Sequence, residues 1–244
     1  MNVYPSKELD EWLRKQEVYW AQRSRVNWIK HGDKNTSFFH SKASQRRQRN
    51  YIKGILDPQG SWREDIEEVV GVAVDYFNNM FSICSCSRIE ECLEAVQQKV
   101  STEMQQTLTS EYTTDEIKAA LFQMGPTKAP GPDGMNALFY QKFWHIVGDN
   151  VVSAVLEFLN SGYMPPALNH TFIVLIPKIK NPVKVSDFRP ISLYNVIYKI
   201  IAKVIANRLK QILPQIISLT QSAFVPGRLI TDNVLVAYEV LHTM

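Results

Sequence analysis

The sequence of 244 residues has few cysteines and no long uncharged apolar run. No fourth cysteine or nearby histidine completes a tetrahedral zinc site, so we expect reduced, structural thiols at Cys84, Cys86 and Cys92. No segment approaches the roughly 18 uncharged apolar residues that a membrane-spanning helix needs. The first residues, which include Lys7 and Glu8, lack a signal-peptide pattern. These absences predict an intracellular protein, in the nucleus or cytoplasm, with no membrane partner.

The aspartates and histidines are also spaced in ways that offer no metal site. None of the ten aspartates is adjacent to another, and they fall in expected turns, helix caps or acidic faces. We interpret the five histidines, whose spacing is not typical of metal ligands, as structural or surface groups: His31, His40, His145, His170 and His242. The sequence therefore predicts no catalytic residue and no metal within this chain.

Charge is distributed unevenly, although the net charge is only +3. Residues 1–63 hold 13 basic and 6 acidic side chains, a balance of +7. Residues 64–116 hold 2 and 12, a balance of −10, and residues 117–244 hold 12 and 6, a balance of +6. With 45% hydrophobic residues, the chain is long enough to bury a core in one or two domains.

The most basic stretch is residues 23–53, where nine lysines and arginines face Asp33 alone. A phosphate backbone is the natural partner of such a stripe, and the candidate contacts are Arg46, Arg47, Arg49 and Lys53. A solvated helix face explains the same charge pattern. Composition does not choose between the two.

Periodicity in the first part of the chain predicts three helices and a hairpin. Apolar residues at helical spacing indicate helices over residues 8–22 and 66–81, and Asn35 can cap a further helix that carries the arginines. Residues 51–56 and 61–63 flank an Asp-Pro-Gln-Gly turn typical of a short hairpin. The polar stretch 82–110, with at most a helix around residues 89–100, is the expected boundary.

The second part of the chain predicts further helices and a strand. Thr113 and Glu116 have the spacing of a capping box. Helices are expected at about 137–147, 150–160 and 195–213, with an apolar strand over 171–176 and a last helix from Thr231 or Asp232. The expected class is α+β, mainly helical, with a basic extension over 1–110 and a second domain over 111–244.

Three short segments carry the strongest functional signal. Lys-Ala-Pro-Gly-Pro-Asp-Gly lies at 128–134, Leu-Ile-Pro-Lys at 175–178, and Asp-Phe-Arg-Pro-Ile-Ser-Leu at 187–193. In this order they resemble the fingers region of reverse transcriptases, most specifically those of plant LINE-type (non-LTR) retrotransposons. With the region upstream, which includes the string from Trp28 to His40, the resemblance spans roughly residues 20–244. It implies the fingers and the start of the palm of a right-hand polymerase.

The resemblance implies a role for each segment. In related polymerases the fingers strands form a hairpin over the incoming nucleotide, so Lys178 and Arg189 are the implied ligands of the dNTP triphosphate. A lysine point charge and an arginine fork suit that anion. Lys180 and Lys184, in the connecting turn, are weaker candidates. Asp187 is expected either to pair with Arg189 or to cap a turn.

Two other segments are implied to lie near the template or nucleotide. In the 128–134 loop, the glycines let the backbone approach a ligand closely, and the prolines restrict the backbone conformation. Taken alone, the loop is typical of a turn. Its candidate residues are Pro130, Gly131, Asp133 and Gly134. Residues 220–233 resemble the entry to the palm. Gln221, Phe224 and Arg228 supply an amide, a stacking ring and a cation. We interpret Asp232 and Asn233 as helix caps.

The aspartates of the family's catalytic palm are absent from this sequence. The family binds two divalent ions through a Phe-x-x-x-Asp segment and a Tyr/Phe-x-Asp-Asp turn, and neither occurs here. The chain is therefore expected to bind RNA template, DNA primer and dNTP without extending a primer. Mg²⁺ is expected only in a full-length family member.

Three other functions remain open from the sequence. The chain is either a truncated polymerase, a non-catalytic nucleic-acid-binding module, an inert retroelement relic, or a scaffold that recognises proteins through the acidic residues 64–116. Only charge supports the last of these.

Overall fold

The computed structural model describes residues 7–24, 36–82, 89–94, 99–218, 221, 225 and 227–243. The chain divides into two compact units. Unit 1 combines residues 1–84 with residues 173–192, and unit 2 combines residues 85–172 with residues 193–244. Residues 173–192 thus belong with the N-terminal part of the chain. Dividing the sequence at a single point does not group these two segments together.

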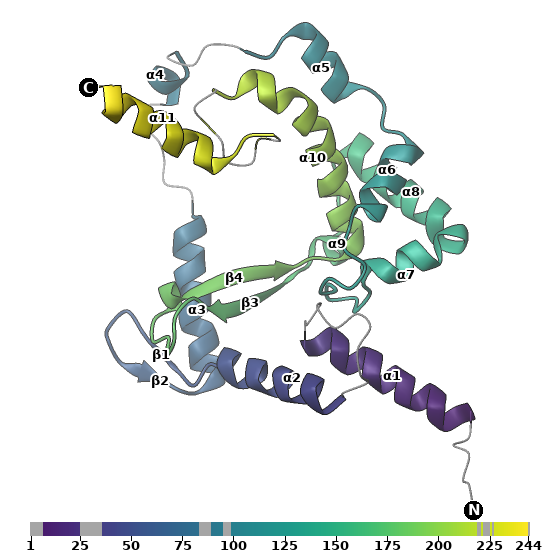
Figure 1. The fold of residues 1–244 in the computed structure, drawn as a ribbon, viewed down its shortest axis with the longest axis vertical. Helices are drawn as coiled ribbons and strands as arrows, with labels where there is room; N and C mark the ends of the chain where they lie inside the picture. Colours follow the sequence, from purple (N-terminus) through teal and green to yellow (C-terminus); the bar gives the residue numbers. More distant parts are fainter. Residues whose placement is uncertain are drawn as a thin grey trace, which may run out of the picture. The chain divides into compact units, whose positions relative to one another are not determined.

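Unit 1 begins with two helices that pack against each other, α1 (Lys7–Ser24) and α2 (Thr36–Asn50) (Figure 1). The rings of Trp20 and His40, one from each helix, lie with centroids 3.6 Å apart. Both helices match the sequence prediction, and α2 carries the predicted arginine cluster.

The predicted hairpin follows as β1 (Ile55–Leu56) and β2 (Trp62–Arg63), which pair antiparallel. Its turn is held by Asp57, whose Oδ1 accepts the backbone N–H groups of Gln59 and Ser61 at 3.0 and 2.8 Å. Arg63 adds an ion pair with Asp57 at 2.9 Å. These bonds, led by that from Ser61, hold the pKa of the Asp57 carboxyl below its usual value.

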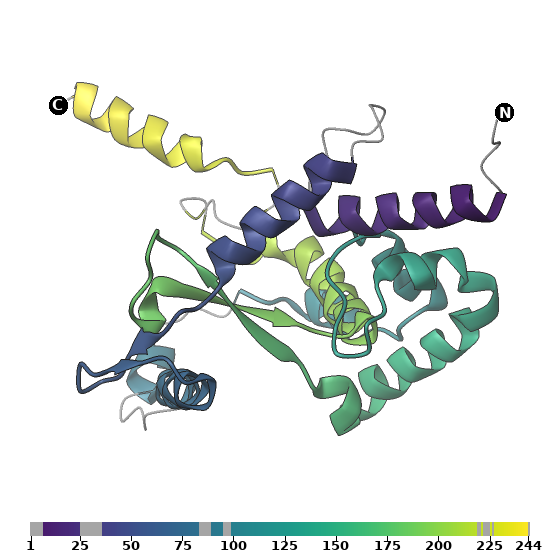
Figure 2. The ribbon, with the colours of Figure 1, turned by 90° about the horizontal axis from the view of Figure 1, so that it is seen from below.

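A second hairpin and a helix complete unit 1. Helix α3 (Ile66–Phe81) is capped by Asp65, and strands β3 (Phe172–Pro177) and β4 (Phe188–Leu193) run in opposite directions on either side of a short 3₁₀ turn at Val185–Asp187 (Figure 1). Figure 2 shows α3 beside the β1–β2 hairpin and the turn end of β3–β4. The core of this unit is small: Ile55, Val185 and Phe188 are buried, with Leu175 and residues of α3 packed around them.

Unit 2 is helical in its described residues. Its elements are α4 (Ile89–Glu94), α5 (Thr102–Thr109), α6 (Thr114–Phe122), α7 (Ala137–Lys142), α8 (Trp144–Ser161), α9 (Pro166–Asn169), α10 (Val196–Ile216) and α11 (Ile230–Thr243). The longest helix, α10, buries one apolar stripe against α6 and α8. That stripe has the 3.6-residue period expected from the sequence, with buried side chains at Val196, Ile200, Ile201, Val204 and Ile212.

The capping box predicted for α6 is present and also serves tertiary structure. The Glu116 carboxylate accepts the backbone N–H of Thr113 at 2.9 Å, while Thr113 Oγ1 accepts the N–H of Glu116. The same carboxylate takes two bonds from Arg208 of α10, at 2.7 and 2.9 Å. Arg208, only 4% exposed, also donates to three carbonyls that precede α6, those of Leu108, Ser110 and Glu111.

The prediction of helices at 137–147 and 150–160 is wrong at their junction. The break lies at Phe143, whose backbone (φ −104°, ψ 22°) is not helical, and α8 then runs unbroken through Gly148. Gly148 is buried under the Trp144 indole, since a Cβ there would lie 2.9 Å from the ring. Packing thus favours glycine inside this helix, and glycine does not break it.

Among the described residues, no helix combines the length and apolarity needed to cross a membrane.

Candidate nucleic-acid interface

Lys178 and Arg189 lie at the turn end of the β3–β4 hairpin. Lys178 directly follows β3, and Arg189 is the second residue of β4. The backbone N–H of Lys178 donates to the carbonyl of Asp187 at 2.7 Å, which joins the two ends of the turn. Both cations are exposed, whereas Phe188 is 2% exposed.

The two cations differ in their local bonding. The Lys178 ammonium donates to the carbonyl of Ser186 at 2.7 Å, which ties it across the hairpin tip. The Arg189 guanidinium makes no hydrogen bond or ion pair with the rest of the chain that the structure describes. Lys180 and Lys184 are exposed on the same tip. The hairpin tip, residues 178–189, therefore presents several cations. Among them, the Arg189 guanidinium is available to bind an anion.

Asp187 caps the hairpin turn, the second of the two alternatives raised by the sequence. Its Oδ2 accepts the backbone N–H groups of Val183 and Lys184 at 3.0 and 2.9 Å. These bonds, that from Lys184 first, lower the pKa of the Asp187 carboxyl. The carboxylate thus shapes the turn that carries the lysines.

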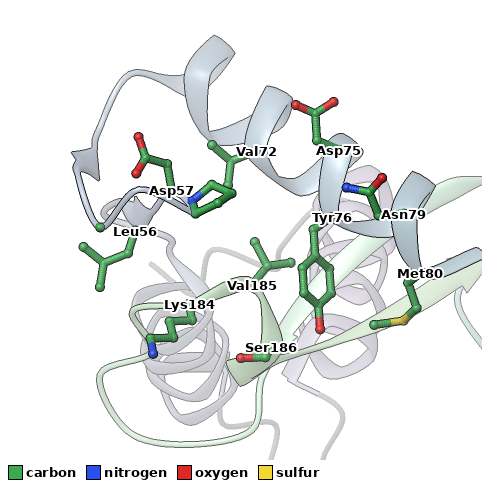
Figure 3. Close-up of a pocket in the computed structure, with 12 residues that line it drawn as sticks. Leu56, Asp57, Val72, Asp75, Tyr76, Asn79, Met80, Lys184, Val185 and Ser186 are labelled. Atoms are coloured by element: carbon green, nitrogen blue, oxygen red, sulfur yellow. The ribbon is translucent and has the colours of Figure 1, made fainter.

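Behind the hairpin tip lies a pocket of about 690 Å³ that is walled by α3. Figure 3 shows the ring of Tyr76 reaching from α3 toward Ser186, with Val185 and Met80 on either side. Lys184 lines the same pocket, so this weaker triphosphate candidate lies at the junction of the tip with α3. Both polar and apolar side chains line the pocket.

The 128–134 loop, in unit 2, is held by two side chains from the start of α10. Asn195, 3% exposed, accepts the backbone N–H of Asp133 through Oδ1 at 3.3 Å and donates to the carbonyl of Ala167. The Lys199 ammonium donates to the carbonyl of Ala129 at 2.9 Å. Gly131 is buried, and a Cβ there would collide with the backbone of Tyr194 and Asn195.

The outer part of this loop is exposed. Asp133 and Gly134 face solvent, Gly134 has a φ of 71°, and Asp133 Oδ1 accepts the N–H of Met135 at 3.1 Å. Burial lowers the pKa of the Lys199 ammonium, and the negative charge of Asp133 opposes that shift. Burial raises the pKa of the Tyr140 hydroxyl, and the Asp133 charge raises it further. Gly131 therefore serves internal packing, while Asp133 and Gly134 remain available to a ligand.

The candidates between residues 220 and 233 fall partly outside the described residues. Gln221 is exposed, and Phe224 lies outside the described part of the chain. The Arg228 guanidinium donates to carbonyls at the end of α10, those of Pro214, Ile217, Ser218 and Gln221. In this structure its cation stabilises a helix C-terminus, and its template-side role remains a prediction.

The basic stripe is partly described. Arg46, Arg47 and Arg49 are exposed on α2, and Lys53 is exposed just beyond it. Arg23 and Lys42 of the stripe are also exposed, whereas its cations at positions 25, 30 and 34 lie outside the described residues, as do Cys84 and Cys86. The exposed arginines leave both the phosphate-binding and the solvated-face interpretations possible.

The structural roles of three polar residues escaped the sequence analysis: Asn195, Lys199 and Arg208. Each of these residues interrupts, or immediately precedes, the apolar stripe of the longest predicted helix. A polar residue at such a position indicates a buried polar contact, and this was the sequence feature that could have revealed their roles. In the described residues no three His, Cys, Asp or Glu side chains gather where they could hold a metal ion.

Comparison with known proteins identifies two relatives among mobile-element proteins. The chain is 32% identical over 241 residues to the "Transposon TX1 uncharacterized 149 kDa protein" of Xenopus laevis, which covers 96% of this chain and 18% of that protein. It is 26% identical over 168 residues to the "RNA-directed DNA polymerase from mobile element jockey" of Drosophila funebris, which covers 66% of this chain and 18% of that protein. No protein-family model matches the chain.

The matched part of each relative is a small share of its length, because the chain spans about 18% of each. Both relatives belong to mobile elements and one is named a polymerase, in agreement with the resemblance found in the motifs. Both come from animals, so the plant-type assignment remains a prediction.

Proposed function

We propose that this chain is the fingers region and palm entry of a reverse transcriptase from a LINE-type, non-LTR retrotransposon of the plant kind. It binds template nucleic acid and the triphosphate of a dNTP. The exposed turn end of the β3–β4 hairpin, which presents Lys178 and Arg189, is the observation that carries the proposal. The similarity to a mobile-element RNA-directed DNA polymerase supports it.

In this proposal, the exposed part of the 128–134 loop lies on the template or nucleotide side of the site. Gln221, Phe224 and Arg228 lie on the same side. Its partners are RNA template, DNA primer and dNTP, in the nucleus or cytoplasm. The sequence has no adjacent aspartates and no Phe-x-x-x-Asp segment, so the 244 residues alone should not extend a primer. Mg²⁺ chemistry belongs to a full-length family member.

The triphosphate site is tested by binding of a fluorescent dNTP to the purified chain. Arg189→Gln removes a charge-assisted bond, typically about 1.5–3 kcal/mol, which corresponds to a dissociation constant roughly 10- to 100-fold higher. Lys118→Gln, an exposed cation on α6, is the matched control and should leave binding unchanged. Equal effects of the two changes would contradict the site.

Primer extension provides a second test of the proposal. We expect no dNTP incorporation by the chain with any template or divalent metal. Incorporation that persists in Arg189→Ala would contradict both the missing-palm argument and the site assignment.

A non-catalytic nucleic-acid-binding module is the second candidate, and the exposed arginines of α2 favour it. Its signature is RNA affinity that falls steeply with salt, because each phosphate contact releases counterions. Salt-dependent RNA binding without any dNTP binding would favour this module over the polymerase fragment. An absence of RNA binding at low salt would argue against both and favour an inert relic.

A further inference from the structure

Helices α1 and α2 enclose a hollow of about 360 Å³ within unit 1. Two residues of α1 and five of α2 line it: Trp20, Arg23, Ala43, Ser44, Arg46, Arg47 and Asn50. Its volume lies at the lower end of the roughly 300–1,000 Å³ found for small-molecule sites. The hollow therefore matches a compact ligand in size.

Packing between the two helices fixes the walls of this hollow. The Trp20 indole is held against the His40 ring at a centroid distance of 3.6 Å, which sets its orientation. The Arg23 guanidinium lies 4.4 Å from the centre of the Tyr19 ring. On α2, positions 43, 46, 47 and 50 recur at helical spacing and face α1, whereas Arg49 does not line the hollow.

The lining chemistry selects for a ligand that is both anionic and aromatic. Three arginines line the hollow, and none of the described residues that line it is acidic. An inorganic anion would engage the arginines but not the indole, and an apolar ligand would leave the arginines unsatisfied. A nucleotide satisfies both, since its phosphate pairs with guanidinium and its base contacts an aromatic ring. Ser44 and Asn50 add hydrogen-bonding groups at the wall.

We propose that the hollow between α1 and α2 binds one unpaired nucleotide of a single-stranded nucleic acid, with the base against Trp20 and the phosphate among Arg23, Arg46 and Arg47. This inference rests on the proposed nucleic-acid binding and adds where a base is held. An unpaired nucleotide is required because a base inside a duplex presents no free face to an indole. The site is separate from the triphosphate candidates on the β3–β4 hairpin.

The experiment compares the full chain bound to a single-stranded oligoribonucleotide and to an abasic ribose-phosphate oligomer of the same length. Trp20→Ala should weaken binding of the first roughly 5- to 100-fold, the usual range for loss of one stacked base, and should leave the abasic oligomer unaffected. Trp12→Ala is the matched control, because Trp12 is 54% exposed on the same helix and does not line the hollow. It should change neither affinity.

Two further variants protect the test against misfolding. Trp20→Phe keeps a ring against His40 and should retain most of the preference for the base-bearing oligomer. Arg47→Gln should lower the salt slope by about 1 for both oligomers. Equal affinity for the two oligomers, or equal effects of Trp20→Ala and Trp12→Ala, overturns this inference while the proposed function stands. Binding of neither oligomer overturns the nucleic-acid part of the proposed function as well.

Discussion

The two units differ in how most of their arginines are used. In unit 1, Arg46, Arg47 and Arg189 are exposed, whereas Arg63 forms ion pairs with Asp57 and Glu68. In unit 2, the guanidiniums of Arg208 and Arg228 donate to the chain's own carbonyls, and Arg208 also pairs with Glu116.

This contrast separates binding from architecture. An exposed guanidinium keeps its hydration and contributes little to folding, so it is available to an incoming phosphate. A buried guanidinium must satisfy its donors internally, and its loss leaves other polar groups without partners. Exposed arginines therefore indicate a candidate site in unit 1, whereas bonded arginines, Arg208 and Arg228 in unit 2 and Arg63 in unit 1, serve structure.

Replacement of Arg208 should give the largest effect on stability. Arg208→Met leaves the Glu116 carboxylate and the carbonyls of the 108–111 segment without their donor. Loss of one partner of a fully buried pair typically costs about 3–5 kcal/mol, and the loss here should lie at the low end because the Glu116 side chain is 32% exposed. Urea denaturation should show this loss, and amide hydrogen exchange should locate it in α5 and α6.

Two controls decide whether the contrast holds. Lys210→Met changes an exposed cation on the same helix and should alter the unfolding free energy by less than about 0.5 kcal/mol. Arg189→Gln in unit 1 should be similarly mild. If Arg189→Gln destabilised the chain as strongly as Arg208→Met, the division between binding and architectural arginines would fail.

A substitution in the 128–134 loop should have the next largest effect on stability. Gly131→Ala places a Cβ against the backbone of Tyr194 and Asn195. Backbone atoms cannot move aside as the end of a flexible side chain can. Such overpacking costs about 1–3 kcal/mol. Gly134→Asn is the control, since that position has open space and a positive φ that asparagine tolerates.

The expected result for Gly134→Asn is a cost below about 1 kcal/mol in the same urea titration. A harmless Gly131→Ala would mean that the loop is not clamped by α10. A reduced dNTP or RNA affinity in Gly134→Asn, without loss of stability, would instead place the exposed part of the loop at a ligand.

Local sequence patterns predicted most elements well. Helix α3, the capping box of α6 and the apolar stripe of α10 all follow from spacing within one helix, which a single sequence displays directly. The break at Phe143 was misplaced because Gly148 stays helical inside α8, where the side chain of Trp144, one turn earlier on the same helix, covers it. The short helix α9 gave no periodic signal to recognise.

The candidate site was predictable in part for a similar reason. The positions of Lys178 and Arg189 beside prolines pointed to a strand end and a turn, whereas the bond that joins Lys178 to Asp187 across the turn depends on the folded hairpin. The partners of Arg208 lie 92–100 residues away in sequence, so no local rule could identify them. Side chains that bind distant backbone were thus the least predictable part.

Acid should reveal the Glu116–Arg208 network by its pH dependence. Hydrogen bonds from Arg208, and then from Thr113, hold the pKa of Glu116 at about 2, below its ordinary value of 4.5. A depressed pKa means that the ionised carboxylate stabilises the fold, so this stability is complete above pH 4.5 and is lost as pH falls toward about 2. The hydrogen-exchange protection factors of amides at the start of α6 should fall across that window.

Glu116→Gln should flatten the pH dependence at α6, because an amide keeps an acceptor for Arg208 but cannot titrate. Arg208→Met should flatten it as well, since the guanidinium is the main cause of the depressed pKa. Asp57 and Asp187 also have lowered pKa values, so unit 1 loses stability in acid through its own turns in all three proteins. An unchanged acid response of α6 in both variants would mean that its stability does not depend on the Glu116–Arg208 pair.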